Sequence, residues 1–298
     1  MIEENHFDLK YTPSQALGHK ALAVNISDVA AMGGMPRWAL VSLALPPHTS
    51  LEFFDGIFKG MKKLAQAAEV EIVGGDIASA PVVVMDVSIL GEACPKHLRY
   101  RSQAVPGEVL MVTGDLGSSA AGLYWLQQGS AHTDEELSGV DELTKKHLQP
   151  WPRYREAQAL REQEVGAMID LSDGLAAGVE EICIASKVGA SIDYSRLPCL
   201  RPTIELSCRE GCSLDPWVLY GGEDYELLFT LPAAAAPQVQ QRLREETGTS
   251  AIVIGEVLAA EEGVKLRNHP EGIDELNSRR SYRHFPSSSQ ELENFSGD

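Results

Sequence analysis

The chain has 298 residues, 44% of them hydrophobic and 23% charged, which is enough for one large or two ordinary globular domains. The formal net charge of −18 disfavours nucleic acid and anionic membranes as partners, because phosphate-rich surfaces are bound mainly by Lys and Arg. No apolar run reaches the ~20 residues of a membrane helix. The five cysteines are scattered without a zinc pattern, so we expect free thiols and a cytoplasmic protein.

The predicted elements mix helices and short strands in two blocks, separated by a polar, basic segment at 96–107. Helices are predicted at 14–33, 51–68, 118–128, 134–148, 153–163, 175–187 and 236–246, and strands at 70–73, 82–90, 109–113, 167–171, 190–194, 225–231 and 251–257. We therefore expect an α+β protein of mixed α/β layers, with domains over 1–104 and 105–285 and a polar, disordered tail over 286–298.

Four short glycine-punctuated acidic motifs occupy residues 25–28, 74–76, 170–174 and 221–224. Each places a carboxylate at a predicted break in regular structure. Carboxylates gathered from distant segments repel one another unless a cation lies between them. Hard oxygen donors suit Mg²⁺, and Mg²⁺ suits phosphates. The motifs together predict a protein that binds a phosphorylated ligand through Mg²⁺.

Each motif also has a simpler structural interpretation. Ser172 or Asp173 could cap the following helix, the motifs at 74–76 and 221–224 could be turns, and Asp28 could be a solvated or hydrogen-bonded helix residue. A cap does not explain Asp170, because a carboxylate in an apolar strand is costly to bury unpaired.

Two further features could bind anions. Arg101 in the basic segment is a candidate for pairing with phosphate oxygens, and the helix after residues 114–117 could offer backbone N–H groups. A solvated basic loop and an ordinary strand–turn–helix remain the alternatives. The sequence contains no P-loop, G-x-G-x-x-G, H-E-x-x-H or G-x-S-x-G motif, which fits recognition of ATP through carboxylates and Mg²⁺.

Taken together and in this order, the motifs resemble those of thiamine-monophosphate kinases of the PurM-like (aminoimidazole-ribonucleotide-synthetase-like) superfamily. The resemblance extends over nearly all of the chain to about residue 285, and it includes the segments at 5–7, 17–33, 73–76, 101, 106–107, 114–123, 150–153, 169–175 and 221–230. It implies a PurM-like fold, with an N-terminal dimerisation and ATP/metal-binding domain and a C-terminal α/β domain. It also implies ATP- and Mg²⁺-dependent phosphorylation of thiamine monophosphate to thiamine diphosphate by direct in-line transfer, commonly in a homodimer.

The resemblance assigns ligand contacts to individual positions of this sequence. They are Asp28, Asp76, Asp170 and Asp173 for Mg²⁺, Gly75, Asp76, Arg101 and Ser172 for ATP, and His6, Glu223 and the aromatic Tyr282 for the thiamine moiety. Asp224 has no implied role.

The sequence also departs from the family pattern. The resemblance implies an earlier segment with a Gly-Asp-Asp motif and a Ser/Thr-Asp-Thr motif, whereas this sequence begins just before Asn5, so we expect some metal ligands to lie outside it. Ser118 stands where the family often has Asp, and Gln103 where Gly is usual. Two alternatives stay open: another PurM-like ATP-dependent phosphotransferase or synthetase, and a non-catalytic member of the family.

Overall fold

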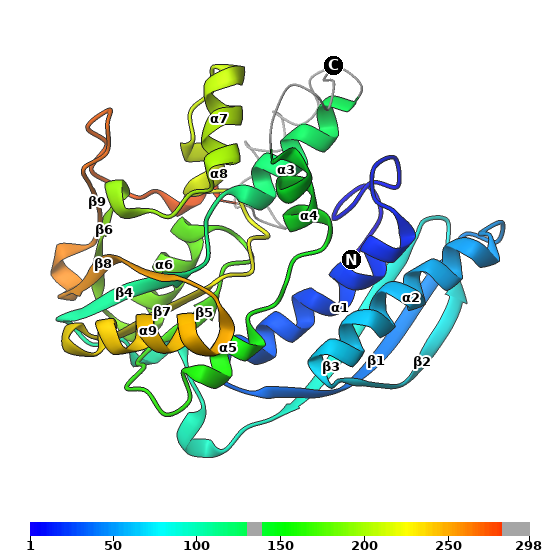
Figure 1. The fold of residues 1–298 in the computed structure, drawn as a ribbon, viewed down its shortest axis with the longest axis horizontal. Coiled ribbons are helices and arrows are strands. Elements are labelled where there is room, and N and C mark those ends of the chain that lie inside the picture. Colours follow the sequence, from blue (N-terminus) through cyan, green and yellow to red (C-terminus); the bar gives the residue numbers. More distant parts are fainter. Residues whose placement is uncertain (130–138, 282–298) are drawn as a thin grey trace.

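The computed structural model describes residues 1–129 and 139–281 and contains two β-sheets (Figure 1). The helices are α1 (Ser14–Ala31), α2 (Leu51–Ala68), α3 (Ser118–Gln128), α4 (Val140–Leu148), α5 (Tyr154–Ala159), α6 (Leu175–Ser186), α7 (Arg201–Glu210), α8 (Asp215–Val218) and α9 (Ala236–Thr247). The strands are β1 (Met35–Leu45), β2 (Glu71–Ser79), β3 (Val84–Glu92), β4 (Glu108–Thr113), β5 (Met168–Asp170), β6 (Gly189–Asp193), β7 (Leu227–Pro232), β8 (Ala251–Leu258) and β9 (Val264–Arg267).

The first sheet has the order β2-β1-β3 and the second the order β5-β7-β4-β8-β6-β9. Most neighbouring strands are antiparallel, whereas β1–β2 and β6–β9 are parallel. The α+β fold expected from the sequence is therefore confirmed. Among the described residues, no helix has the length and apolar character needed to cross a membrane.

Helix α1 is the central element of the molecule. It packs against α2, β1 and β3 on one side and against α4, α5 and β5 on the other, and it crosses the middle of Figure 1 between the two sheets. A Cβ atom on Gly18 would lie 1.9 Å from the carbonyl oxygen of Ile57, so glycine at this position allows the close approach of α2. Because α1 is buried on nearly all sides, its side chains contact elements of both halves of the chain.

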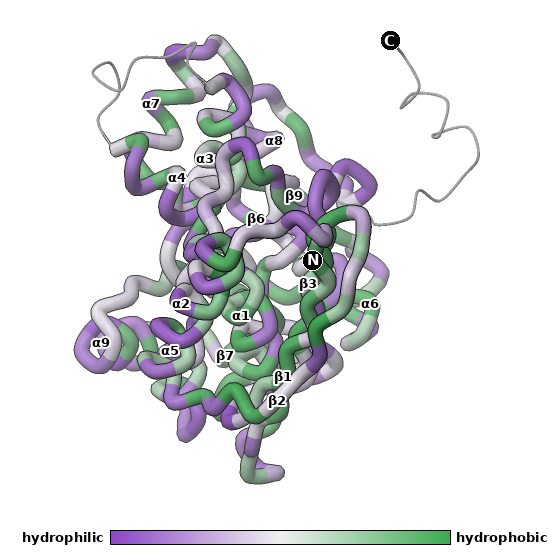
Figure 2. Tube along the Cα trace, turned by 90° about the vertical axis from the view of Figure 1, so that its right-hand side faces the viewer, coloured by the Kyte–Doolittle hydropathy of each residue, from purple (hydrophilic) through white to green (hydrophobic). Residues whose placement is uncertain are grey.

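The three-stranded sheet covers α1 and α2 with one face only. Along β1, Ala39, Val41 and Leu43 point toward the helices, whereas Trp38 and Leu40 alternate with them on the outer face and are 39% and 42% exposed. Figure 2 shows hydrophobic segments of β1 and β3 at this surface. Strand β1 is absent from the elements predicted above, although its alternation is typical of a half-buried strand.

The structure corrects the expectation of a break at 74–76, because β2 continues through this motif to Ser79. Gly75 pairs with Val41, and a Cβ atom on Gly75 would lie 1.8 Å from the Val41 carbonyl oxygen. The glycine thus allows close parallel pairing and does not mark a turn. Asp76 is opposite Ser42 in the same ladder and lies on the exposed outer face.

Other differences concern the ends of elements and the C-terminal half. The described part of the predicted helix at 134–148 begins at Val140, α5 ends at Ala159, four positions before the predicted end, and α7, α8 and β9 were not predicted. Tyr282 and the predicted tail over 286–298 lie outside the described residues.

Candidate active site

One side of α1 carries the contacts that organise the site. Lys20 and Ser27 are seven residues apart, so they lie on one side of the helix and are separated by a rise of about 10 Å. Lys20 contacts Glu223 and Ser27 contacts Asp170. The acidic motifs at 170–174 and 221–224 are therefore held at two points along the same helix.

A cavity of about 320 Å³ lies at the Ser27 end of α1, between this helix and the turn from β5 into α6. We call it the acidic cavity. Its lining includes five of the residues assigned above: Asp28, Arg101, Asp170, Ser172 and Asp173. The predicted strand, turn and helix around 170–175 are present and supply Asp170, Ser172 and Asp173, whereas Asp28 comes from α1.

Asp170 is a buried residue that lines the acidic cavity, and it accepts a hydrogen bond of 2.6 Å from Ser27 Oγ. Burial, together with the charges of Asp28 and Asp173, raises its pKa to about 6 against the stabilising effect of Ser27. Desolvation also raises the pKa of Asp28. The cavity thus concentrates negative charge that is costly for the protein alone.

The donor chemistry of the acidic cavity fits Mg²⁺ bound together with phosphates. Within residues 1–129 and 139–281, no three His, Cys, Asp or Glu side chains are already arranged to enclose a metal ion. Mg²⁺ commonly takes only one or two carboxylates from the protein and its remaining oxygens from water and substrate phosphates. Asp28, Asp170 and Asp173 could supply the protein's share.

Arg101 forms an ion pair with Glu181 of α6 at the edge of the acidic cavity. Both side chains are substantially exposed, so the pair contributes little to stability and an incoming phosphate could replace it. Glu181 was not singled out from the sequence, because an acidic residue on a helix is typical of a solvated face.

Gly75 and Asp76 do not line the acidic cavity, since β2 places them on the exposed edge of the three-stranded sheet. Asp76 Oδ1 accepts a local hydrogen bond from Ile77 N at 2.9 Å. The structure therefore brings together three of the four aspartates assigned to Mg²⁺. The roles of Gly75 and Asp76 stay predictions.

A second cavity of about 860 Å³ shares Ser172 and Asp173 with the acidic cavity. We call it the large cavity. Its lining combines aromatic and polar side chains, including His6, Tyr124, His147, Trp217, Glu223 and Tyr225. The two cavities meet at the turn after β5, so ligands bound in them would approach each other there.

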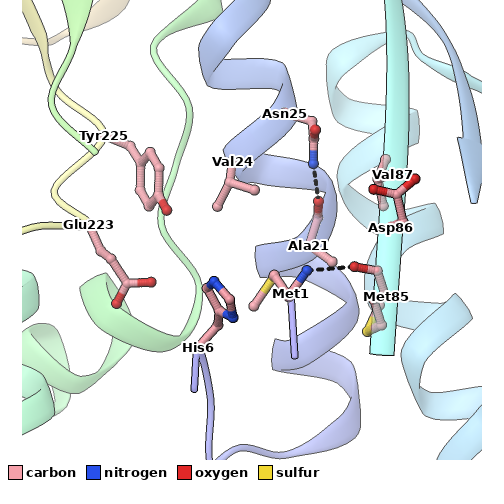
Figure 3. Close-up of a pocket in the computed structure, with 10 residues that line it drawn as sticks. All are labelled: Met1, His6, Ala21, Val24, Asn25, Met85, Asp86, Val87, Glu223 and Tyr225. Carbon is pink, nitrogen blue, oxygen red and sulfur yellow. Dashed lines mark hydrogen bonds between the residues drawn. The ribbon is translucent and has the colours of Figure 1, made fainter. Parts of the chain in front are cut away.

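A smaller cavity of about 240 Å³ extends from the large cavity toward β3 (Figure 3). Figure 3 shows Glu223 and Tyr225 on one side, Asp86 on the other and His6 between them. His6 and Glu223, both assigned to the thiamine moiety, therefore line the same two cavities. Tyr282, the third assigned residue, lies outside the described residues.

Glu223 is bound by two side chains that the sequence analysis did not single out. Its Oε1 lies 2.8 Å from Lys20 Nζ, and its Oε2 lies 3.3 Å from His147 Nδ1. Burial and the charge of Lys20 lower the pKa of His147 to about 2, so this histidine is neutral.

Asp224 occupies the anion position predicted at the helix after 114–117. Its Oδ2 accepts a hydrogen bond from Gly117 N at 2.8 Å, and its Oδ1 accepts one from Ser119 N at 3.2 Å. The N-terminus of α3 is thus satisfied by the chain's own carboxylate. Asp224 fixes the loop that carries Glu223 and does not enter either cavity.

Two family models match the chain, and they correspond to its two sheets. The model for the N-terminal domain of AIR synthase related protein matches residues 1–93, and the model for the C-terminal domain matches residues 105–266. These matches, with the two-sheet architecture, define an AIR synthase related protein of PurM-like fold.

Individual relatives show which family of AIR synthase related proteins the chain belongs to. The thiamine-monophosphate kinase of Bacillus subtilis (strain 168) is 38% identical over 236 residues, which cover 78% of this chain and 70% of that protein. The thiamine-monophosphate kinase of Buchnera aphidicola subsp. Schizaphis graminum is 32% identical over 288 residues, or 96% of this chain and 85% of the relative. The solved structure "AaThiL complexed with AMPPCP and TMP" has a TM-score of 0.83 at 30% identity and covers 96% of this chain and 85% of its own. The chain belongs to the thiamine-monophosphate kinase family.

Proposed function

We propose that this protein transfers the γ-phosphoryl group of ATP to thiamine monophosphate, giving thiamine diphosphate and ADP. The observation that carries the proposal is the meeting of the acidic cavity and the large cavity at Ser172 and Asp173. Family membership supports the choice of substrates, because the solved structure that matches this chain with a TM-score of 0.83 is complexed with AMPPCP and TMP.

In this proposal each cavity receives a different part of the reactants. The acidic cavity receives the phosphates of ATP, with Arg101 and Ser172 donating to phosphate oxygens. The large cavity receives the thiamine moiety beside His6 and Glu223. The substrate's own phosphate then points toward Asp173, where the two cavities meet.

Asp28, Asp170 and Asp173 would hold Mg²⁺, which supplies charge neutralisation between the phosphates of the two ligands. An oxygen of thiamine monophosphate attacks the γ-phosphorus in line, the bond to the β-phosphate oxygen breaks, and ADP leaves. No side-chain nucleophile is required, because the acceptor is an anionic phosphate oxygen. The protein's task is to position the reactants and exclude water.

We also propose that two copies of the chain associate through the outer face of the three-stranded sheet. Trp38, Leu40 and Leu90 are exposed on this face, and β2 is an unpaired edge strand beside them among the described residues. Leu40→Glu would place a charge in the contact, so sedimentation should detect monomers for this variant and dimers for the parent chain. Equal sedimentation of both proteins contradicts this interface.

The activity is tested by following thiamine diphosphate and ADP when the protein is mixed with thiamine monophosphate, ATP and Mg²⁺. We expect both products in equal amounts and none when ATP or Mg²⁺ is omitted. Absence of thiamine diphosphate from the complete mixture contradicts the proposed function. Thermal stabilisation by a different phosphorylated metabolite, and not by thiamine monophosphate, would favour another PurM-like phosphotransferase.

A further inference from the structure

Lys20 is an unusually buried lysine in the middle of α1. It is 1% exposed and is among the largest fully buried side chains of the described residues. An isolated buried ammonium group would be very unfavourable, so its contacts must compensate for lost hydration. Its Nζ lies 2.8 Å from Glu223 Oε1 and 3.5 Å from His147 Nε2. Lys20, from the N-terminal half, therefore contacts Glu223, a residue of the C-terminal half that lines the large cavity.

The contacts of His147 define which of its nitrogens carries the proton. An ammonium group has only N–H donors, so Nε2 facing Lys20 must accept a hydrogen bond. Since the ring is neutral, the proton resides on Nδ1. Nδ1 lies 3.3 Å from Glu223 Oε2 and 3.2 Å from Ser119 Oγ, so it can donate toward the carboxylate. Lys20 and His147 thus approach Glu223 on different oxygens.

Glu223 remains partly open to ligand despite these two contacts. Its side chain is 30% exposed, and it lines both the large cavity and the cavity of Figure 3. Its backbone has φ 68°, an uncommon conformation for a residue other than glycine, and the neighbouring Asp224 fixes it to the start of α3. A carboxylate offers about four lone-pair positions, so two directions remain for ligand donors.

We propose that Lys20 and His147 are positioning residues that orient Glu223 as a hydrogen-bond acceptor for an N–H group on the organic end of the substrate. The ligand class is an amino-substituted nitrogen heterocycle carrying a phosphate. This inference rests on the proposed function and adds to it how the non-phosphate end is selected. A heterocycle with an exocyclic amine would satisfy the acceptor, whereas a close analogue without the amine would leave it unpaired.

A purely structural role for Lys20 makes a different prediction. A buried ion pair is weak evidence of stabilisation, and loss of one partner destabilises mainly by leaving the other charge unpaired. Such a loss would lower the melting temperature without a selective effect on one substrate. The positioning role predicts an effect on the thiamine monophosphate KM that depends on Glu223.

The test is a double-mutant cycle of Lys20→Met and Glu223→Gln, with the KM for each substrate and kcat measured for all four proteins. We expect each single variant to raise the KM for thiamine monophosphate on the order of 10-fold or more. Lys20→Met loses the orientation of the acceptor, and Glu223→Gln loses its charge. The KM for ATP should stay within about 2-fold, and the double variant should resemble Glu223→Gln within about 2-fold. Independent multiplication of the two effects, or an unchanged KM in Lys20→Met, overturns the proposal.

His147 provides a second route if Lys20→Met does not fold. His147→Leu removes the donor and should raise the same KM about 10-fold, whereas His147→Gln retains an N–H donor and a carbonyl acceptor and should restore most of it. Equal KM values for these two variants also overturn the proposal. The surface variant Lys265→Met, which loses an ion pair with Glu262, is the matched control. A parent protein that forms no thiamine diphosphate refutes the proposed function, whereas normal parent turnover with an unchanged KM in the variants refutes only this inference.

Discussion

The two carboxylates held by α1 have opposite electrostatic surroundings. Asp170 contacts Ser27 and has the acidic neighbours Asp28 and Asp173, which help to raise its pKa to about 6. Glu223 lies between Lys20 and His147. The same helix thus supports one site where several carboxylates lie close together and another whose carboxylate is paired with a buried lysine.

The difference indicates what each site requires from outside. Carboxylates that lie close together favour a bound cation, which in turn binds phosphates. A paired carboxylate has no such need, and its remaining lone pairs can serve directional hydrogen bonds. We therefore expect changes at the Asp170 end to affect turnover and nucleotide binding, and changes at the Glu223 end to affect recognition of the organic moiety.

The largest effect is expected for Asp173→Asn, at the junction of the acidic cavity and the large cavity. The substitution removes a charge where the phosphates of both ligands approach, so kcat should fall by about 10³-fold, a loss typical of electrostatic stabilisation of the transition state. Steady-state kinetics check this, with Asp141→Asn, at an exposed position in the first turn of α4, as control. A loss below about 10-fold would place the chemistry elsewhere.

The next effect concerns stability at the Asp170 end. With the pKa of Asp170 raised from 3.8 to about 6, the folded protein holds a proton that the unfolded chain releases, so stability falls as pH rises through this window. The penalty reaches about 3 kcal/mol above pH 6, since each pKa unit corresponds to about 1.36 kcal/mol. Asp170→Asn should lack this loss.

Urea unfolding at pH 4 and pH 7 without Mg²⁺ measures the difference. Asp170→Asn should gain stability relative to the parent chain as pH rises, and added Mg²⁺ should stabilise the parent more than the variant. Parallel pH dependence of the two proteins would show that Asp170 is not the group responsible.

Substitutions of Arg101 and Glu181 should change the KM for ATP in opposite directions. Arg101→Met should raise the KM for ATP about 10-fold, because a charged donor to phosphate is lost. Glu181→Gln should lower this KM by about 2-fold, because the ion pair no longer competes with the ligand. Kinetics with varied ATP measure both, and a higher KM in Glu181→Gln would contradict competition.

The smallest effects are expected for two serine hydroxyls that each make one hydrogen bond, only one of them at the acidic cavity. Ser27 Oγ donates to Asp170, and Ser50 Oγ accepts from Phe53 N at the start of α2. Ser27→Ala and Ser50→Ala should each reduce stability by about 1 kcal/mol. Only Ser27→Ala should also change turnover, and an equal change in Ser50→Ala would mean that the effect is not local to the acidic cavity.

Much of the acidic cavity was predictable from the sequence, because residues that are adjacent in the chain form most of it. The strand, turn and helix around Asp170, Ser172 and Asp173 follow from an apolar run interrupted by a polar–glycine motif. The position of Asp28 in a helix was also expected. That the helix faces this turn is a tertiary contact, which periodicity alone does not encode.

The contacts of Glu223 with Lys20 and His147 could not be predicted from the sequence in the same way. His147 contacts Lys20 from 127 positions away, and a lysine in an otherwise apolar helix is usually a solvated residue. The burial of α1 on both sides reverses that expectation for Lys20. Strand β2 is a similar case, because two glycines look like a turn until the close approach of Val41 is known.

The most direct test is calorimetric titration of the parent chain, Asp170→Asn and Glu223→Gln with two probes, AMPPCP with Mg²⁺ and unphosphorylated thiamine. We expect a crossed pattern: Asp170→Asn loses affinity for AMPPCP with Mg²⁺ and keeps its affinity for thiamine, whereas Glu223→Gln does the reverse. Equal weakening of both ligands by either substitution would contradict the division of the site into a phosphate end and an organic end.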